Sequence, residues 1–265
     1  MKKLAQQADR YELYEESVQN VEFEVSFYKK MFKRFANRDA VSLREDFCAS
    51  AKISVEWVKK SKFAKSYAVD LDKKVLDYAK NISSNNLTSE QKKRLHLIYA
   101  DSINYMSPKV DIVSACNFSY WVFKTREKLK KYFKNTYTCL KKDGIFVLDA
   151  FGGYEAHQEL EERTKHKNFT YVWDQHSFNP VTNDLTCFIH FEFKDKSRIN
   201  RAFKYEWRLW SLMEIKECLN ESGFKSVDFF MQGWDEKKNE ETERFYKTNK
   251  CDADPGWLAY IIAKK

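Results

Sequence analysis

Residues 40–51, with the sequence AVSLREDFCASA, and residues 66–70, SYAVD, give the clearest indication of the fold. The first stretch predicts an apolar strand and a tight turn, after which Ile53 and Trp57 share one face of a predicted helix. The second stretch predicts a short strand that ends on an acid, Asp70. This order is typical of open α/β sheets, which bind their ligands at the carboxyl ends of the strands.

The composition indicates a globular domain with a substantial core. The chain has 265 residues, of which 43% are hydrophobic and 32% are charged. No apolar run approaches the roughly 20 residues that cross a bilayer, and the N-terminus lacks the apolar segment of a signal peptide. We therefore expect a cytoplasmic protein, a monomer or homodimer, with no membrane partner.

Neither the charge nor the cysteines point to a specialised class. The net charge is +8, from 47 Lys and Arg against 39 Asp and Glu, but the lysines are spread along the chain. A bias in composition therefore explains the charge better than nucleic-acid binding. The six cysteines form no C-x-x-C pair and none has a histidine at zinc-ligand spacing, so we expect buried thiols and no metal site.

Strands alternate with helical segments over the first 150 residues, which requires parallel crossovers. Beyond the two strands above, the pattern predicts strands at 95–100, 110–115 and 145–150. Residues 4–36 are predicted to be helical, although 21–27 also alternate like a strand. This segment is either an ordinary packing helix or a lid, residues 1–36, that brings Tyr14 to a ligand.

The pattern changes after residue 150. A polar helix is predicted to about residue 165, and from Phe169 to Leu209 the hydrophobic period is two. This period predicts a three-stranded antiparallel meander inserted at about 166–210. The elements predicted to follow are a helix from Ser211, a strand at 225–232, a charged loop at 234–256 and a last strand at 257–263. We expect one domain, residues 37–265, with the meander as an insertion.

The order of elements and several local sequences resemble the seven-stranded class I S-adenosylmethionine-dependent methyltransferases. LREDFC, YAVDLD, NFSYWVFKTR and LKKDGIFVLDAFGG occur where that family has its motifs, and FTYVW, RLWSLMEI and GWDE resemble one bacterial and archaeal branch of it. The resemblance covers about residues 10–265. It implies an α/β fold with a doubly wound, mostly parallel seven-stranded sheet, an N-terminal helical lid and an inserted antiparallel meander.

The resemblance also implies a site for S-adenosylmethionine, with S-adenosylhomocysteine as the product. The family places its ribose-binding acid at Asp70, with Leu71 against the adenine, and it recognises the adenine amine at Asp101 and Ser102. Glu45 is the acid of the first motif, where it orients the loop and faces the methionine ammonium.

Further positions follow from the same motifs. Cys48 and Ala49 lie in the first turn, and Asn117 to Tyr120 are expected at the lip of the crevice beside the transferring methyl group. Asn117 is therefore expected to contact the cofactor, and Tyr14 is expected to do so through the N-terminal lid. The candidate catalytic residues are Tyr14, Asn117, Tyr120 and His157.

The first turn departs from the family pattern E/D-x-G-x-G-x-G. Its three glycine positions hold Phe47, Ala49 and Ala51. Alanine at a positive-φ position costs on the order of 1 kcal/mol, and its methyl group occupies space beside the ligand. The departure favours an alternative, a degenerate methyltransferase-like binding protein without activity.

Three functions therefore remain open. The first is a methyltransferase acting on a small or medium-sized acceptor, such as an amine, beneath an aromatic roof that the meander provides. The second is the degenerate, non-catalytic binding protein. The third is an RNA-modifying methyltransferase, which the charge favours and the absence of an added RNA-binding domain disfavours. A small-molecule acceptor is preferred to nucleic acid.

Overall fold

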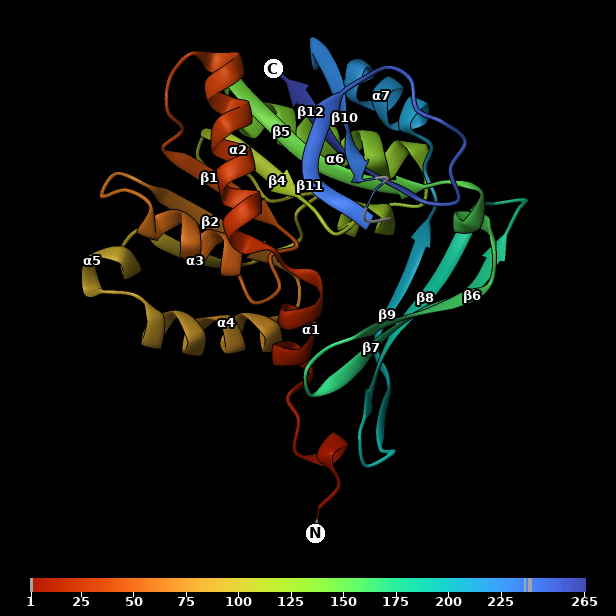
Figure 1. Cartoon of the computed structure of the whole chain (residues 1–265). Helices are drawn as coiled ribbons and strands as arrows, with labels where there is room; N and C mark the ends of the chain where they lie inside the picture. The colour runs from red at the N-terminus through yellow and green to blue at the C-terminus, as the bar shows by residue number, and fades with distance from the viewer. Residues whose placement is uncertain (1, 236, 238–239) are drawn as a thin grey trace.

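The computed structural model describes residues 2–235, 237 and 240–265, which form two sheets flanked by helices (Figure 1). Within these residues the central sheet has eight strands in the order β11-β10-β12-β5-β4-β1-β2-β3. They are β1 (Ser42–Asp46), β2 (Lys65–Asp70), β3 (Leu95–Tyr99), β4 (Val110–Ala115), β5 (Leu140–Gly152), β10 (Ser226–Asp235), β11 (Glu240–Lys247) and β12 (Trp257–Lys264).

Strands β1 to β5 pair in parallel, and β12 is antiparallel to β5. Helical segments return the chain to the same end of the sheet before β2, β3 and β5, and a loop without a helix does so between β3 and β4. The predicted doubly wound, mostly parallel sheet is thus confirmed, although the described sheet has eight strands where seven were predicted. All five parallel strands end at one edge, where a ligand site is expected.

Helices cover both faces of this sheet. Helices α2 (Val21–Ala36) and α3 (Lys52–Lys59) pack on one face, and α6 (Arg126–Cys139) and α7 (Leu212–Glu221) pack on the other. Successive side chains of a strand point to opposite faces of the sheet. In β5, residues 145 and 147 therefore pack in the core with α2 and α3, and residues 146 and 148 pack in the core with α6 and α7. None of the described helices is both long and apolar enough to cross a bilayer.

The second sheet contains the predicted meander and one additional strand. Strands β7 (Phe169–Asn179), β8 (Asp184–Phe193) and β9 (Arg198–Arg208) are antiparallel neighbours, as predicted. The polar helix predicted before residue 165 is wrong, because Leu160–Lys165 forms β6 and pairs with β7. Pairing with β7 gives the polar backbone of β6 its hydrogen bonds, an advantage that local propensity does not report.

The charged segment after β10 also differs from the prediction. Within the predicted loop at 234–256, Glu240–Lys247 forms β11 and pairs with β10, while residues 236 and 238–239 lie outside the described part of the chain. Phe245 explains this strand, because its ring packs against Phe23 and Tyr260 at centroid distances of 5.6 and 4.8 Å. A single aromatic residue thus attaches a charged strand to the core.

The N-terminal segment is helical, as predicted, and the strand alternative at 21–27 is wrong. Helix α1 (Arg10–Val18) precedes α2, which begins after the cap Asn20. In Figure 1, α1 lies between the second sheet and α4 (Lys73–Asn86). The Tyr11 ring makes this contact, at centroid distances of 5.0 Å from Tyr78 on α4 and 6.0 Å from Phe203 on β9.

Candidate active site at the carboxyl edge of the sheet

The turn after β1 keeps a glycine-like backbone although it contains no glycine. The φ angles of Phe47, Ala49 and Ala51 are 56°, 46° and 56°, all in the left-handed region. Hydrogen bonds hold this shape: the Cys48 N–H donates to the Val69 carbonyl at 3.0 Å. The three substitutions therefore leave the path of the turn open to a ligand but place strain in it.

Asp70 holds the same turn from the end of β2. Its carboxylate accepts from the Ala49 N–H at 2.9 Å and from the Asp72 N–H at 2.8 Å. Burial raises the pKa of Asp70 above its ordinary value. The acid that ends the second strand thus fixes the turn at the end of the first one.

Glu45 connects the end of β1 to α3. Its carboxylate accepts from the Ser54 N–H at 2.9 Å, and burial raises its pKa to about 7. Sequence reasoning missed the neighbouring Arg44, which pairs with Asp46 at 2.7 Å and donates to the Ser102 carbonyl at 2.9 Å. An arginine inside a buried strand was the available signal. It fastens the loop after β3 to β1.

These groups surround a cavity of about 510 Å³, called here the sheet-edge cavity. Its walls are residues 45–50, Asp70, the end of β4, helix α1 and strand β9. Three buried acceptor atoms that line it have no hydrogen-bond partner among the described residues: Glu15 Oε1, Gln19 Oε1 and Ser114 Oγ. Buried polar atoms are normally satisfied, so these three are suited to ligand hydrogen bonds.

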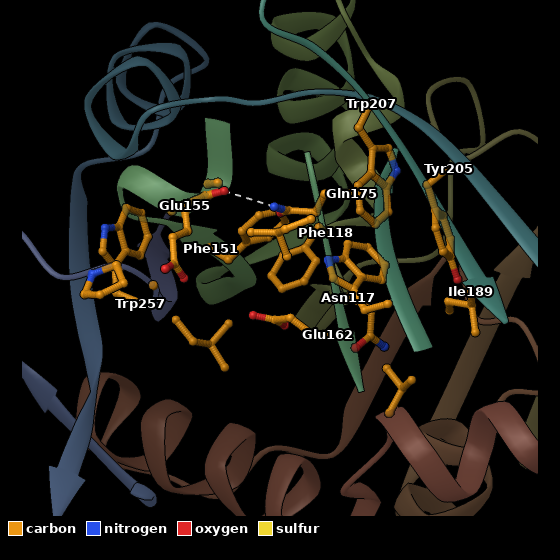
Figure 2. A pocket seen from close by; sticks show the side chains of 18 of the residues that line it. Asn117, Phe118, Phe151, Glu155, Glu162, Gln175, Ile189, Tyr205, Trp207 and Trp257 are labelled. Carbon is orange, nitrogen blue, oxygen red and sulfur yellow. Dashed lines mark hydrogen bonds between the residues drawn. The ribbon is translucent and has the colours of Figure 1, made fainter. Parts of the chain in front are cut away.

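A second cavity of about 320 Å³, the aromatic cavity, adjoins the first (Figure 2). Four residues line both cavities and form a shared wall: Tyr14, Asn117, Tyr205 and Trp207. Three aromatic residues of the shared wall line the aromatic cavity, and five further aromatic residues complete its lining: Phe118, Phe151, Tyr171, Trp173 and Trp257. Two ligands bound in the two cavities would meet at the shared wall.

The shared wall holds two tyrosine hydroxyl groups. Burial raises the pKa of Tyr14 to about 12 and raises that of Tyr205 well above its ordinary value. Tyr14 therefore stays protonated at neutral pH, which suits it to orient a ligand rather than to act as a base.

Asn117 is held in place by Asp149, a site residue that the sequence analysis did not single out. Asn117 and Phe118 both have φ of 56°, and the Asp149 carboxylate accepts from their N–H groups at 2.6 and 2.9 Å. Burial raises the pKa of Asp149 to about 7. Its place at the end of β5, another acid at a strand end, was the available signal.

Comparisons with known proteins agree with this geometry. A family model described as a methyltransferase domain matches residues 46–148. An S-adenosylmethionine-dependent methyltransferase from Clostridium acetobutylicum superposes with a TM-score of 0.71 and 19% identity over 96% of both chains. No curated protein sequence is similar enough to count as a relative.

Two further solved structures share the architecture. The amino pentose methyltransferase CalS10 from Micromonospora echinaspora has a TM-score of 0.67 and 12% identity over 97% of both chains. The sugar N-methyltransferase KedS8 from a Streptoalloteichus species has a TM-score of 0.65 and 11% identity, with 97% of this chain and 93% of that chain covered. This chain has the class I methyltransferase fold.

The methyltransferase fold brings six of the predicted site residues together. Those that line the sheet-edge cavity are Tyr14, Glu45, Cys48, Ala49, Asp70 and Asn117. They come from α1, the β1 turn and the ends of β2 and β4, so their proximity depends on the parallel sheet.

Two candidate catalytic residues lie elsewhere, contrary to the expectation. Tyr120 is fully buried in the core, and its hydroxyl donates to the Asp149 carbonyl at 2.8 Å. His157 is exposed, and its ring packs 5.0 Å from that of Phe178. Neither residue belongs to the described lining of the sheet-edge cavity or of the aromatic cavity. The local sequence could not report which way these side chains turn.

Three predicted cofactor residues also lie outside the sheet-edge cavity. Leu71 is 63% exposed, Ser102 is buried, and the Asp101 carboxylate accepts from the Ile103 N–H at 3.1 Å. None of the three belongs to the described lining of that cavity. Asp101 and Ser102 instead shape the loop that Arg44 fastens to β1.

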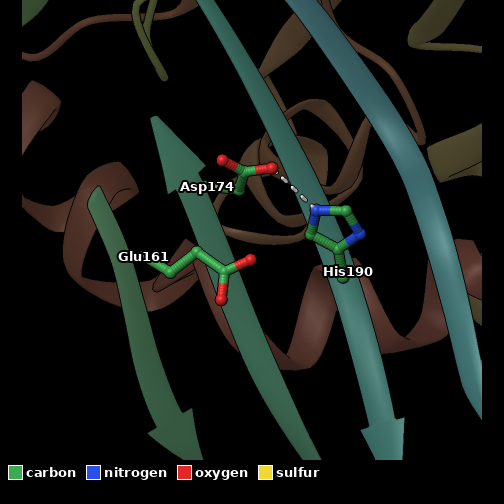
Figure 3. Close-up of side chains that lie close together, drawn as sticks. All are labelled: Glu161, Asp174 and His190. Atoms are coloured by element: carbon green, nitrogen blue, oxygen red, sulfur yellow. Dashed lines mark hydrogen bonds and ion pairs between the residues drawn. The ribbon is translucent and has the colours of Figure 1, made fainter. Parts of the chain in front are cut away.

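One group of three metal-capable side chains lies close together among the described residues: Glu161, Asp174 and His190 (Figure 3). His190 Nδ1 accepts from the Arg201 N–H at 2.9 Å, so its proton is on Nε2, which donates to Asp174 at 3.1 Å. Both ring nitrogens are thus engaged. The group is explained as support for the irregular β9 backbone at Arg201, where φ is 51°.

Proposed function

We propose that this chain is an S-adenosylmethionine-dependent methyltransferase that methylates a nitrogen of a small-molecule acceptor. The observation that carries this proposal is the pair of cavities that meet at Tyr14, Asn117, Tyr205 and Trp207. One cavity lies at the strand ends, where α/β folds bind their ligands, and the other is lined by aromatic rings. Two proteins of similar structure, a sugar N-methyltransferase and an amino pentose methyltransferase, support a nitrogen acceptor.

The sheet-edge cavity fits S-adenosylmethionine. Its volume of about 510 Å³ is in the range of small-molecule sites, and its polar groups are mainly acceptors. The orphan Glu15 Oε1 and the carboxylates of Glu45 and Asp70 match the ammonium and the ribose hydroxyls of the cofactor. The left-handed turn at Ala49 places backbone beside the same space.

The bound cofactor supplies a methyl group activated by its sulfonium, and an amine lone pair forms the new bond as the carbon–sulfur bond breaks. The protein's contribution is to orient the acceptor and to exclude water. Tyr14 and Tyr205 keep their protons at neutral pH, because burial raises the pKa of each hydroxyl. They orient the uncharged amine, which therefore binds without its proton or loses it to water on entry.

Cofactor binding is the direct test. Isothermal titration of the purified protein with S-adenosylhomocysteine should give saturable binding, and Asp70→Asn should weaken that binding about tenfold or more. Asp77→Asn is the matched control, because Asp77 is an exposed acid on α4 that pairs with Lys73 at 2.9 Å. Absence of binding by the folded wild-type protein would overturn the proposal in favour of the degenerate, non-catalytic protein.

A further inference from the structure

The charged side chains in the described lining of the aromatic cavity are all acidic. Three carboxylates line it: Glu155, Glu162 from β6, and Glu241 from β11. No Lys or Arg belongs to its described lining, and no described Lys or Arg forms an ion pair with any of the three. Gln232 adds a buried amide oxygen, Oε1, without a hydrogen-bond partner. The cavity therefore offers acceptors and negative charge to a ligand.

Glu155 lies at the far end of the aromatic cavity from the shared wall. Figure 2 shows Glu155 and Trp257 at the opposite end of the cavity from Tyr205 and Trp207, with Glu162 pointing into the space between. Burial and then the neighbouring Glu155 and Glu241 raise the pKa of Glu162, so these carboxylates repel one another when the cavity is empty of cations. A cation at this end would relieve the repulsion.

The walls suit a cation as well. Aromatic faces attract ammonium groups, and Trp gives the strongest attraction. Trp173 and Trp207 are neighbours with ring centroids 6.1 Å apart, and Trp257 lies beside the acids. An anionic acceptor, such as a phosphorylated one, would meet three carboxylates and no balancing cation among the described lining residues.

From this arrangement we infer that the acceptor is a diamine or a longer polyamine. One ammonium is held by Glu155, Glu162 and Glu241, while a second, uncharged nitrogen reaches the shared wall. The inference rests on the proposed function, because it assigns the reacting nitrogen to the wall that adjoins the sheet-edge cavity. It adds the requirement for a second basic group, which a monoamine acceptor lacks.

Binding measured by titration in saturating S-adenosylhomocysteine tests the inference with three probes of similar length. We expect 1,5-diaminopentane to bind at least about tenfold more tightly than 1-aminopentane, and 6-aminohexanoate to bind more weakly than either, since hydrogen bonds to charged groups are the stronger ones. Equal affinities for the diamine and the monoamine would overturn the inference.

Substitutions of single carboxylates test which of them bind the diamine. Glu162→Gln should weaken 1,5-diaminopentane binding about tenfold and leave S-adenosylhomocysteine binding unchanged, and Glu155→Gln provides a second test. Glu161→Gln is the matched control, because Glu161 is the preceding residue of β6, lies outside the described lining of the aromatic cavity, and pairs with Arg163. If Glu162→Gln and Glu155→Gln both keep the wild-type diamine affinity, the inference is wrong while the proposed function stands. If the wild type fails to bind S-adenosylhomocysteine, the proposed function itself is wrong.

Discussion

Replacement of Ala49 by glycine should stabilise the protein, contrary to the usual effect of such a change. Ala49 has φ of 46°, and a left-handed residue other than glycine costs roughly 1–2 kcal/mol. Glycine removes this cost but loses roughly 0.5–1 kcal/mol in backbone entropy. Ala49 is only partly buried, so little packing is lost. We expect Ala49→Gly to raise the free energy of unfolding by about 0.5–1 kcal/mol.

Two other alanines make the comparison specific. Ala51 has φ of 56° but is fully buried, so the lost methyl contact, about 0.8 kcal/mol, offsets the relief of strain and Ala51→Gly should be nearly neutral. Ala79 is fully buried inside α4, where glycine only weakens the helix. Ala79→Gly should therefore destabilise the protein by about 1–2 kcal/mol.

Urea denaturation at 25 °C, with and without S-adenosylhomocysteine, measures all three variants. Ala49→Gly also removes a methyl group from the lining of the sheet-edge cavity, so we expect S-adenosylhomocysteine to bind it at least as tightly as the wild type. A loss of stability in Ala49→Gly as large as that in Ala79→Gly would refute the reasoning, because the turn would then have no left-handed strain to release.

Three further predictions concern buried charges. Burial raises the pKa of Glu24 to about 8, so the native state keeps a proton that the unfolded state loses near its ordinary pKa of 4.5, and stability falls as the pH rises through this window. Relative to the wild type, the free energy of unfolding of Glu24→Gln should therefore rise by on the order of 3 kcal/mol between pH 5 and pH 8.5, as measured by urea denaturation. Glu22→Gln, at an exposed position of the same helix, should show no such rise. Equal pH profiles for the two variants would contradict this prediction. Arg44→Met leaves Asp46 buried and unpaired, and should cost about 3–5 kcal/mol, so a loss under about 1 kcal/mol in the same assay would refute the role of the pair. Asp149→Ala removes the acceptor of two N–H groups in the turn after β4; we expect a lower melting temperature and weaker S-adenosylhomocysteine binding, and an unchanged protein would disprove its positioning role.

The parallel half of the fold was predictable because its signals are local. Buried strands such as β4, VDIVSA, are short apolar runs, and the helices between them have one apolar face. The two strands that were missed, β6 and β11, are charged. Each is held by backbone pairing to a neighbour, and β11 also by the ring of Phe245 against the core, and a local pattern contains neither partner.

The candidate site divides in the same way. Strand-end residues such as Asp70 and Asn117 could be placed from sequence, because parallel strands deliver their carboxyl ends to one edge. Tyr120 and His157, which line neither cavity, lie within the short 3₁₀ turns Ser119–Val122 and Tyr154–His157, where one residue more or less redirects a side chain.

The sequence by itself determined that the first five strands run parallel, the edge of the sheet at which a ligand site is expected, and the unusual turn without glycine. These features follow from local hydrophobic periodicity and from the chirality of parallel crossovers. Only the tertiary structure decided that the turn keeps its left-handed shape and that two cavities share a wall. It also brought Glu155, Glu162 and Glu241 together from three separate segments. Such convergence depends on long-range strand pairing, which no local stretch of sequence encodes.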